Sequence, residues 1–278
     1  MRLLAPILIA IFLLPAALAA QTMERIKETG TINIGFRTDA APLSYLADNQ
    51  PQGYTPTVCF ALAYQIGQQL GMTDLEVLYQ TVTTENRFEK VAQGEIDLLC
   101  GAATITLSRR EIVDFSVPVY VDGATVALRA DGPTSLQGLA GQKIGVRSGT
   151  TTSDTLMNSL KSQQIEAEVI QFDDHAGGMD ALDQDEIQAY FADQSILMNL
   201  LLQQENALDF KILEEILTVE KQGLALARGD DDFRLAVDRG LARLFDDGTM
   251  REAFAKTVPA AEPGFALEAM FLTSPTQP

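Results

Sequence analysis

Histidine, cysteine and tryptophan are almost absent from this chain. Its 278 residues include one histidine, His175, two cysteines and no tryptophan. One histidine and two cysteines cannot build a metal site with a familiar ligand spacing, and no phosphate-binding or dinucleotide-binding glycine pattern occurs. The segment 145–149, Gly-Val-Arg-Ser-Gly, has its serine in the wrong place for the nucleophile motif of serine hydrolases. The sequence therefore predicts no metal, no cofactor and no serine hydrolase.

Positive charge is also scarce. The chain has 20 lysines and arginines against 38 aspartates and glutamates, which gives a formal net charge of −18. This balance argues against nucleic acid or an anionic membrane as a partner. If the ligand is itself an anion, it must be held by a local cluster of cations, because the overall field of the protein repels it.

An apolar run of membrane-spanning length is missing, but a shorter one stands at the N-terminus. Arg2 precedes apolar residues 3–14, which are followed by Pro15 and the small-residue stretch 16–20. This pattern is typical of a cleaved secretory signal peptide, here residues 1–20. A membrane anchor is disfavoured because a spanning helix needs roughly 20 apolar residues. We expect a soluble mature protein in the periplasm.

The two cysteines, Cys59 and Cys100, are the only candidates for a disulfide. Cysteines of a secreted chain usually pair. On the chain-entropy model, closing a loop of this length destabilises the unfolded state by roughly 4 kcal/mol. The alternative is a pair of buried free thiols.

Strand-like and helix-like patterns alternate along the chain, which is typical of an α/β fold. The β-rich segment 31–36 precedes a helical stretch at about 57–70, and the alternation continues to a helix at about 231–245. The stretches 120–124 and 219–223 look like extended connections between two lobes. Two crossings would make one lobe discontinuous, with residues 21–121 and 223–278 in the first lobe and 122–222 in the second.

One segment has the features of an anion site. The strand-like residues 143–146 are followed by Gly149 and then by Thr150, Thr151 and Thr152. The first N–H groups of a helix that starts there would favour an anion, and a threonine hydroxyl adds a donor. Ordinary helix capping is the simpler interpretation of this segment taken alone.

A second motif makes the pattern more specific. Residues 100–110 run Cys-Gly-Ala-Ala-Thr-Ile-Thr-Leu-Ser-Arg-Arg, and Asp-Phe-Ser follows at 114–116. This motif resembles the signature of the polar amino-acid solute-binding proteins of ABC transporters. The turn at 149–151 and Asp193 match two further landmarks of that family in order and distance. The likeness extends over the mature chain to about Lys256.

Within that family the chain is most similar to the glutamate/aspartate-binding branch. The similarity rests on Gly-Phe-Arg at 35–37, Thr-Glu-Asn-Arg at 84–87 and Asp-His at 174–175. The resemblance implies a periplasmic binding protein of type II, in which two α/β lobes are joined by a two-strand hinge and the ligand cleft lies between them. It also implies a monomer that delivers its ligand to a membrane permease and has no catalytic activity.

The resemblance also implies a role for each site residue. Arg109 and Thr151 would hold the α-carboxylate of the ligand, and Asp193 with Thr104 would hold its α-ammonium. Ala102 belongs to the same site but stands where relatives often have a hydroxyl residue, so one hydrogen bond is either lost or supplied by the backbone.

The side-chain carboxylate would be held by Arg37, Arg87 and His175, together with Thr84. A site with three arginines and one aspartate carries a net charge of +2 before an acidic amino acid brings −1. A neutral amide ligand would leave a further buried charge unmatched, which typically costs ~3 to 5 kcal/mol. We therefore expect glutamate or aspartate to bind more tightly than glutamine or asparagine.

Three alternatives remain open at this stage. Each arginine could be an ordinary surface residue with a salt bridge, and Asp193 could merely cap the helix that follows it. The chain could be an enzyme that resembles cyclohexadienyl dehydratase on the same fold, with His175 or Asp193 as a general acid or base. It could also be a soluble sensor that reports its ligand to a membrane receptor.

Overall fold

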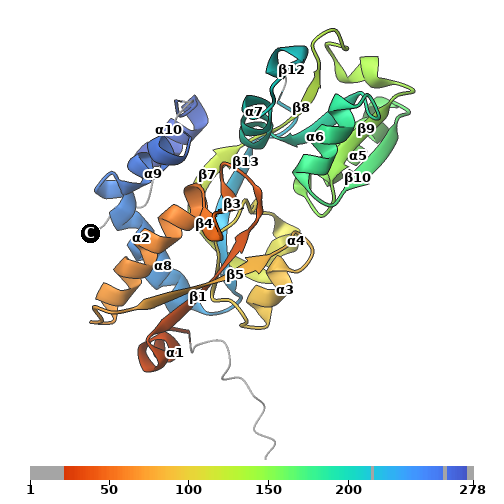
Figure 1. The fold of residues 1–278 in the computed structure, drawn as a ribbon. Helices are drawn as coiled ribbons and strands as arrows, with labels where there is room; N and C mark the ends of the chain where they lie inside the picture. Colours follow the sequence, from red (N-terminus) through yellow and green to blue (C-terminus); the bar gives the residue numbers. More distant parts are fainter. Residues whose placement is uncertain (1–21, 214–215, 259–261, 274–278) are drawn as a thin grey trace, which may run out of the picture.

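A computed structural model describes residues 22–213, 216–258 and 262–273 (Figure 1). The predicted signal peptide at 1–20 lies outside these ranges. None of the helices within them combines the length and the apolar character that a membrane crossing requires. The described chain forms two lobes, each built around a five-stranded sheet.

The first lobe has the strand order β5-β1-β6-β13-β7. Strand β1 pairs in parallel with β5 and β6, whereas β13 pairs antiparallel with β6 and β7. The N-terminal elements of this lobe are α1 (Thr22–Thr29), β1 (Thr31–Arg37), β2 (Asp39–Ala40), β3 (Ser44–Ala47), β4 (Gln50–Gln52), α2 (Tyr54–Gln69), β5 (Glu76–Val82), α3 (Arg87–Ala92), β6 (Leu98–Leu99), α4 (Leu107–Arg110) and β7 (Val113–Asp122). The chain returns to it through β13 (Glu220–Ala227), α8 (Asp231–Asp246), α9 (Thr249–Thr257) and α10 (Phe265–Leu272).

The second lobe has the strand order β10-β9-β11-β8-β12. Strands β9, β10 and β11 are parallel to one another, and β8 is antiparallel to β11 and β12. Its elements are β8 (Ala124–Arg129), the short 3₁₀ helix η1 (Leu136–Leu139), β9 (Lys143–Arg147), α5 (Thr151–Gln163), β10 (Glu168–Phe172), α6 (His175–Asp183), β11 (Ala189–Asp193), α7 (Gln194–Leu202), η2 (Ala207–Asp209) and β12 (Phe210–Ile212).

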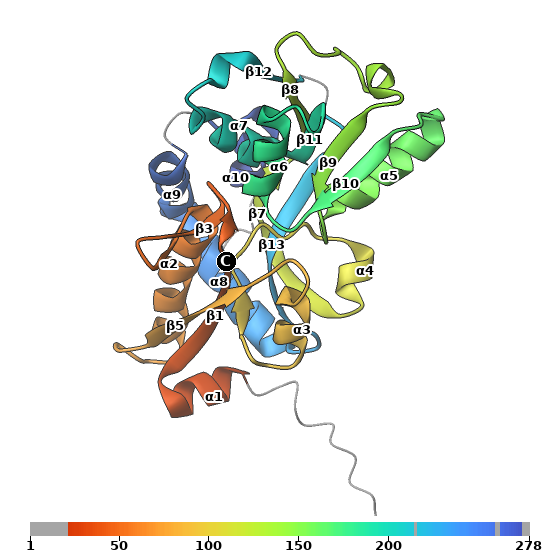
Figure 2. The ribbon, with the colours of Figure 1, turned by 45° about the vertical axis from the view of Figure 1, so that its right-hand side comes forward.

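Two strands connect the lobes. Strands β7 and β13 lie side by side between them in both ribbon views (Figures 1 and 2). They are paired at the end that faces the second lobe, where Glu220 lies opposite Asp122. Because both connections are paired strands, the two lobes can rotate about them without breaking either sheet.

The helix α8 shows how the sequence builds the first lobe. The Asp230 carboxylate accepts a hydrogen bond from the Phe233 amide at 3.1 Å, which caps the helix start. Its apolar side chains recur at helical spacing and are buried against the sheet and α2. A Cβ atom on Gly240 would lie 2.4 Å from Leu62 of α2, so the two helices approach closely only because this position is glycine.

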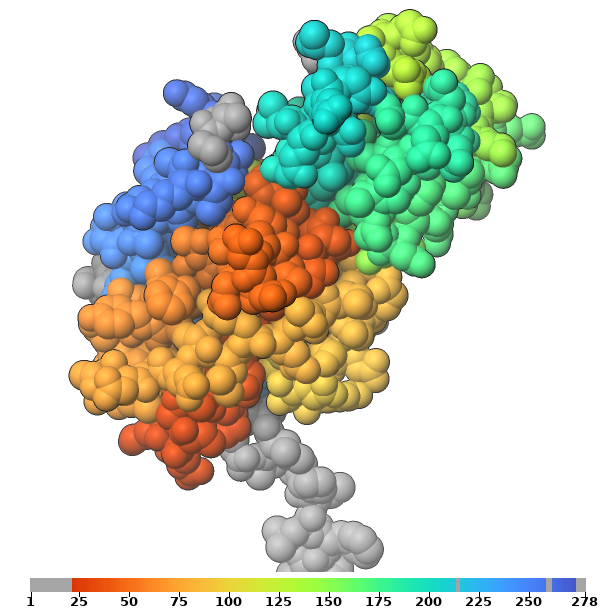
Figure 3. All heavy atoms as spheres, viewed as in Figure 1, coloured from red at the N-terminus to blue at the C-terminus, as the bar shows by residue number. Residues whose placement is uncertain are grey.

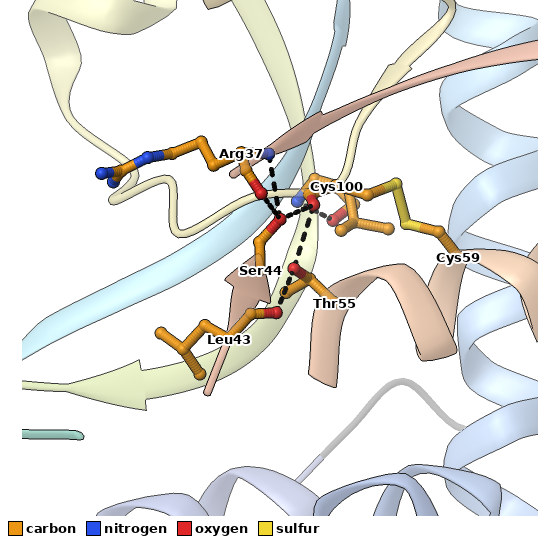
Figure 4. The surroundings of a disulfide bond; sticks show 8 residues. Arg37, Leu43, Ser44, Thr55, Cys59 and Cys100 are labelled. Atoms are coloured by element: carbon orange, nitrogen blue, oxygen red, sulfur yellow. Dashed lines mark hydrogen bonds between the residues drawn. A yellow bond between two sulfur atoms is a disulfide. The ribbon is translucent and has the colours of Figure 1, made fainter. Parts of the chain in front are cut away.

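A disulfide anchors the site-bearing end of this lobe (Figure 4). Cys59 of α2 is bonded to Cys100, with the Cα atoms 6.3 Å apart. The predicted pairing is confirmed, and the alternative of two free thiols is wrong. The carbonyl of Cys100 accepts hydrogen bonds from the Ser44 and Thr55 hydroxyls, and Ser44 also accepts one from the amide of Arg37. The side chain of Arg37 points away from the disulfide, so this network fixes the backbone from which that arginine extends.

The lobes meet along one boundary. The space-filling view shows the orange surface near residues 40–50 against the green second lobe (Figure 3). Strand β2 contacts helix α6 there. The predicted α/β fold with two lobes is therefore confirmed.

Candidate functional site

A small polar cavity lies where the two lobes meet. Both lobes contribute to its lining, which consists of Arg37, Arg87, Ala102, Thr104, Arg109, Arg147, Thr150, Thr151, Thr152, His175, Phe191, Ala192, Asp193 and Ile196. Three of the charged side chains stand at strand ends, because Arg37, Arg147 and Asp193 are the last residues of β1, β9 and β11. The carboxyl ends of strands are where α/β sheets usually bind ligands.

Arg87 is the most buried of the cavity's charges, with 1% of its surface exposed. Its Nη1 donates to the Ala102 carbonyl at 3.0 Å, and its Nη2 donates across the lobe boundary to the Gly149 carbonyl at 3.4 Å. Its Nε has no hydrogen-bond partner among the described residues. Burial, and then the nearby positive charges of Arg37 and Arg109, lower the pKa of Arg87. An anion in the cavity would relieve this repulsion.

Arg109 is oriented by its neighbours. Its Nη1 donates to the Thr104 carbonyl at 2.7 Å. Its guanidinium lies over the Phe88 ring, 5.0 Å from the ring centroid, and the Arg87 guanidinium lies 4.8 Å from the same centroid. One aromatic ring therefore supports two guanidinium groups by cation–π contact.

Two carboxylates lie close together at the hinge side of the cavity. Asp193 accepts hydrogen bonds from Thr152 at 3.2 Å and from Gln222 at 2.9 Å. Burial, and then the charge of Glu220, raise the pKa of Asp193 to about 6. A cation beside these two carboxylates would be strongly favoured, because it would relieve their mutual repulsion. The Asp193 side chain makes no helix-capping hydrogen bond, so the interpretation of Asp193 as a mere cap of α7 is wrong.

Glu220 connects both lobes through threonine hydroxyls. Thr104 of the first lobe and Thr151 of the second both donate to its Oε2, the latter at 2.7 Å. The two hydroxyls lie 3.2 Å apart. Thr150, not Thr151, caps helix α5, since its hydroxyl accepts from the Ser153 amide at 3.2 Å. The side chain of Thr151 is therefore directed to the lobe boundary.

His175 is the first residue of α6 and is 3% exposed. Its Nδ1 lies 3.0 Å from the Tyr190 hydroxyl, whereas its Nε2 has no partner among the described residues. Burial, and then the positive charge of Arg37, lower the pKa of His175 to about 3. The imidazole is thus neutral near pH 7 and can bind a ligand only as a hydrogen-bonding group.

Eight of the nine residues that the sequence nominated line this cavity, and Thr84 does not. The Thr84 hydroxyl donates to Glu85, and its side chain packs against Gly149 across the lobe boundary. Gly149 has φ +67°, and an added Cβ there would lie 3.1 Å from Thr84. Ala102 contributes its carbonyl oxygen, which binds Arg87. The structure thus brings eight nominated residues together and leaves Thr84 at the edge.

Three charged residues were missed by the sequence reasoning. Arg147 lines the cavity and is 4% exposed. Asp39 lies between two guanidinium groups, since Arg37 Nε is 2.9 Å from its Oδ1 and Arg147 Nε is 3.1 Å from its Oδ2. Glu220 is the third. Arg147 could have been found from its place between a strand and a glycine turn, but no pattern in the sequence marks the partners of Asp39 or Glu220.

These residues change the charge of the site. Four arginines and three carboxylates, Asp39, Asp193 and Glu220, leave an excess of one positive charge when all are ionised and the exposed Glu85 beside Arg147 is set aside, where the sequence reasoning gave two. A ligand with two carboxylates and one ammonium would bring this sum to zero. The cavity can therefore match each charge of such a ligand.

A larger hollow of about 420 Å³ lies elsewhere, beside α7, α9 and α10. Its described lining is mostly apolar, with Met198, Leu202 and Phe265, and contains no arginine, lysine or histidine. Its described lining therefore offers a carboxylate no cationic partner. Within the described ranges, no group of three or more histidine, cysteine or acidic residues could hold a metal ion.

Comparison with known proteins places this site in context. The chain is 25% identical over 238 residues to an L-glutamate/L-aspartate-binding protein of Pseudomonas aeruginosa, covering 84% of this chain and 79% of that protein. It is 31% identical over 228 residues to a glutamate/glutamine/aspartate/asparagine-binding protein of Rhodobacter capsulatus, covering 80% and 65%. Among solved structures, the receptor for L-cysteine of Neisseria gonorrhoeae matches with a TM-score of 0.76 and 27% identity, covering 87% and 97%.

The family itself follows from a match over most of the chain. Residues 32–259 match the model of the bacterial extracellular solute-binding proteins, family 3. The matched segment includes the second lobe, most of the first, both connecting strands and every residue that lines the cavity. The chain therefore belongs to the bacterial extracellular solute-binding proteins of family 3.

Proposed function

We propose that this protein binds glutamate or aspartate in the cavity between its lobes and delivers it to the membrane permease of an ABC importer. The observation that carries the proposal is a buried cavity with four arginines, in which Arg87 Nε and His175 Nε2 have no partner among the described residues. Unpaired buried donors are costly, so a ligand with acceptor oxygens would be stabilised there. The printed names of several relatives, which are glutamate/aspartate-binding proteins, support the same ligand class.

The ligand would be held at two ends. Arg109 and Thr151 bind the α-carboxylate, and Asp193 with Thr104 binds the α-ammonium, with Glu220 as an additional anion nearby. A bidentate guanidinium contact and a carboxylate–ammonium contact match each charge of the zwitterion. At the far end, Arg37, Arg87 and His175 bind the side-chain carboxylate.

Binding is the whole activity in this proposal. We propose lobes of residues 21–121 with 223–278 and of residues 122–222, which close on the ligand by rotation about β7 and β13. A monomer secreted to the periplasm with its signal peptide removed fits this role. Enzymatic turnover, as in a cyclohexadienyl-dehydratase-like protein, is disfavoured because His175 is buried and neutral and four arginines surround the cavity. A sensor role would use the same binding site.

Calorimetric titration of ligand-stripped protein against the twenty amino acids tests the proposal. Glutamate or aspartate should bind more tightly than their amides and than every other amino acid. Turnover assays with arogenate and prephenate should show no product. Tighter binding of a neutral or basic amino acid would contradict the proposed ligand, and co-purification with a kinase instead of a permease would favour the sensor role.

A further inference from the structure

We propose that Arg147 is a specificity-determining residue that keeps the positive charge of Arg37 available to the ligand. The inference rests on the proposed function and extends it to a residue that does not face the ligand's α-groups. Arg147 ends β9 in the second lobe, whereas Arg37 ends β1 in the first. The carboxylate of Asp39 lies between them.

The Asp39 carboxylate pairs with two arginines at once. Arg37 approaches Oδ1 of Asp39, with Nε at 2.9 Å and Nη2 at 2.7 Å. Arg147 approaches the other oxygen, Oδ2, with Nε at 3.1 Å. If Arg147 were neutral, Asp39 and Arg37 would form an isolated pair with no net charge. With Arg147 present, the three groups together carry one positive charge at the end of the cavity that faces the ligand side chain.

Arg87 also brings a positive charge to this end of the cavity, so the charge left on Arg37 and Arg147 adds to that of Arg87. His175 lies at the same end but is neutral above about pH 3, because burial and then Arg37 lower its pKa. Glu85 also pairs with Arg147, through Oε1 and Nη1 at 3.0 Å, but its side chain is 56% exposed, so solvent screens this pair. The Glu85 contact joins the two lobes without entering the cavity lining.

Arg147 therefore has two separable effects. Its pair with Glu85 can form only when the lobes meet, so it favours the closed form for every ligand alike. Its pair with Asp39 also joins the lobes, and in addition it sets the charge at the side-chain end, so this pair alone favours a carboxylate over an amide there. Variants at Glu85 and Arg147 distinguish the two effects.

The experiment measures Kd for glutamate and glutamine in parallel, using ligand-stripped full-length mature protein. Arg147→Gln should lower the glutamate-to-glutamine affinity ratio by about tenfold to a hundredfold, since removing a charge roughly 6 to 12 Å away changes binding by this amount at an effective dielectric constant near 20. Glu85→Gln should weaken both ligands equally, by about two- to fivefold, and less so at high salt. Glu89→Gln, on the exposed surface of α3, is the matched control and should change neither Kd.

Two more variants keep the test decisive. Arg147→Lys retains the charge and should restore most of the ratio. Asp39→Asn removes the shared anion and should raise the ratio above that of the wild type, even if Arg147→Gln does not fold. The inference would be overturned if Arg147→Gln left the affinity ratio unchanged. It would also be overturned if Arg147→Lys did not raise the ratio above that of Arg147→Gln and Asp39→Asn did not raise it above that of the wild type. Wild-type protein with no preference for an acidic amino acid would instead overturn the proposed function, because that result does not involve the variants.

Discussion

Substitution of Arg87 by methionine is the sharpest test of how the cavity selects its ligand. Methionine keeps most of the packing volume beside Phe88 but removes the guanidinium, so the side-chain carboxylate of glutamate would lose a buried cationic partner. Leaving one member of a buried pair unmatched costs about 3 to 5 kcal/mol, which corresponds to roughly a hundredfold to several thousandfold in Kd. A neutral amide loses only a hydrogen bond, about 0.5 to 1.5 kcal/mol or up to about tenfold.

The variant also leaves two carbonyl oxygens, of Ala102 and Gly149, without their donor. This loss affects the lobe boundary and should weaken every ligand by the same factor, so the measured quantity is the ratio of glutamate to glutamine Kd from calorimetric titration. Far-ultraviolet circular dichroism and a thermal melt establish that the variant is folded, and Arg110→Met on the exposed face of α4 is the control. Equal losses for glutamate and glutamine would refute the assignment of Arg87 to the side-chain carboxylate.

Three further predictions concern other parts of the site. Arg109→Ala should raise the Kd of every amino acid beyond detection by calorimetry, while Arg110→Ala leaves binding intact, because only Arg109 is placed to hold the shared α-carboxylate. Affinity for glutamate, measured from pH 5 to 8, should fall by up to tenfold per pH unit below about pH 6. The pKa of Asp193 is about 6, so below that pH its carboxylate is protonated and no longer pairs with the ligand ammonium. A flat pH profile would contradict this role of Asp193. Cys59→Ser with Cys100→Ser should lower the unfolding free energy in urea by about 4 kcal/mol and leave the glutamate-to-glutamine ratio unchanged; a changed ratio would show that the disulfide shapes the site.

Local pattern was sufficient to predict the α/β class and most central elements. The strand at 31–36 and the helix at 231–245 are observed within one residue of their expected ends, because buried alternation and a helical apolar stripe are properties of each segment alone. The strand Glu168–Phe172 was missed. It lies at the edge of its sheet and is only partly buried, and its residues Glu-Val-Ile-Gln-Phe do not show the strict alternation of a half-buried strand.

The connections between the lobes were predicted as extended segments but not as paired strands. Residues 120–124 and 219–223 belong to or adjoin β7 and β13, which pair with each other from Val113 opposite Ala227 to Asp122 opposite Glu220. Pairing between segments about 100 residues apart in sequence depends on tertiary structure, and no local property of either strand reveals its partner. The short sheet β2-β3-β4 was missed for a related reason, since its strands have two to four residues each.

The candidate site shows the same division between local and nonlocal information. The sequence identified arginines by residue type and by resemblance, because a guanidinium has the same charge wherever it lies. It did not identify how much of that charge a ligand would meet, which depends on the acid beside each arginine. The Asp39 carboxylate binds one arginine from each lobe. Glu220 accepts hydrogen bonds from Thr104 and Thr151, each more than 60 residues away in sequence.

The protein's overall acidity and its cationic cavity follow from this same pairing. With a net charge of −18, the surface repels an anionic ligand, and screening by salt limits that repulsion to within about 10 Å at 0.1 M. Inside the cavity, low solvent exposure makes the nearby charges dominant, and one positive charge remains after the arginines and carboxylates are paired. Selection of an acidic amino acid therefore depends on that single excess charge and not on the number of arginines, so replacing one acid such as Asp39 should alter selectivity as strongly as replacing an arginine.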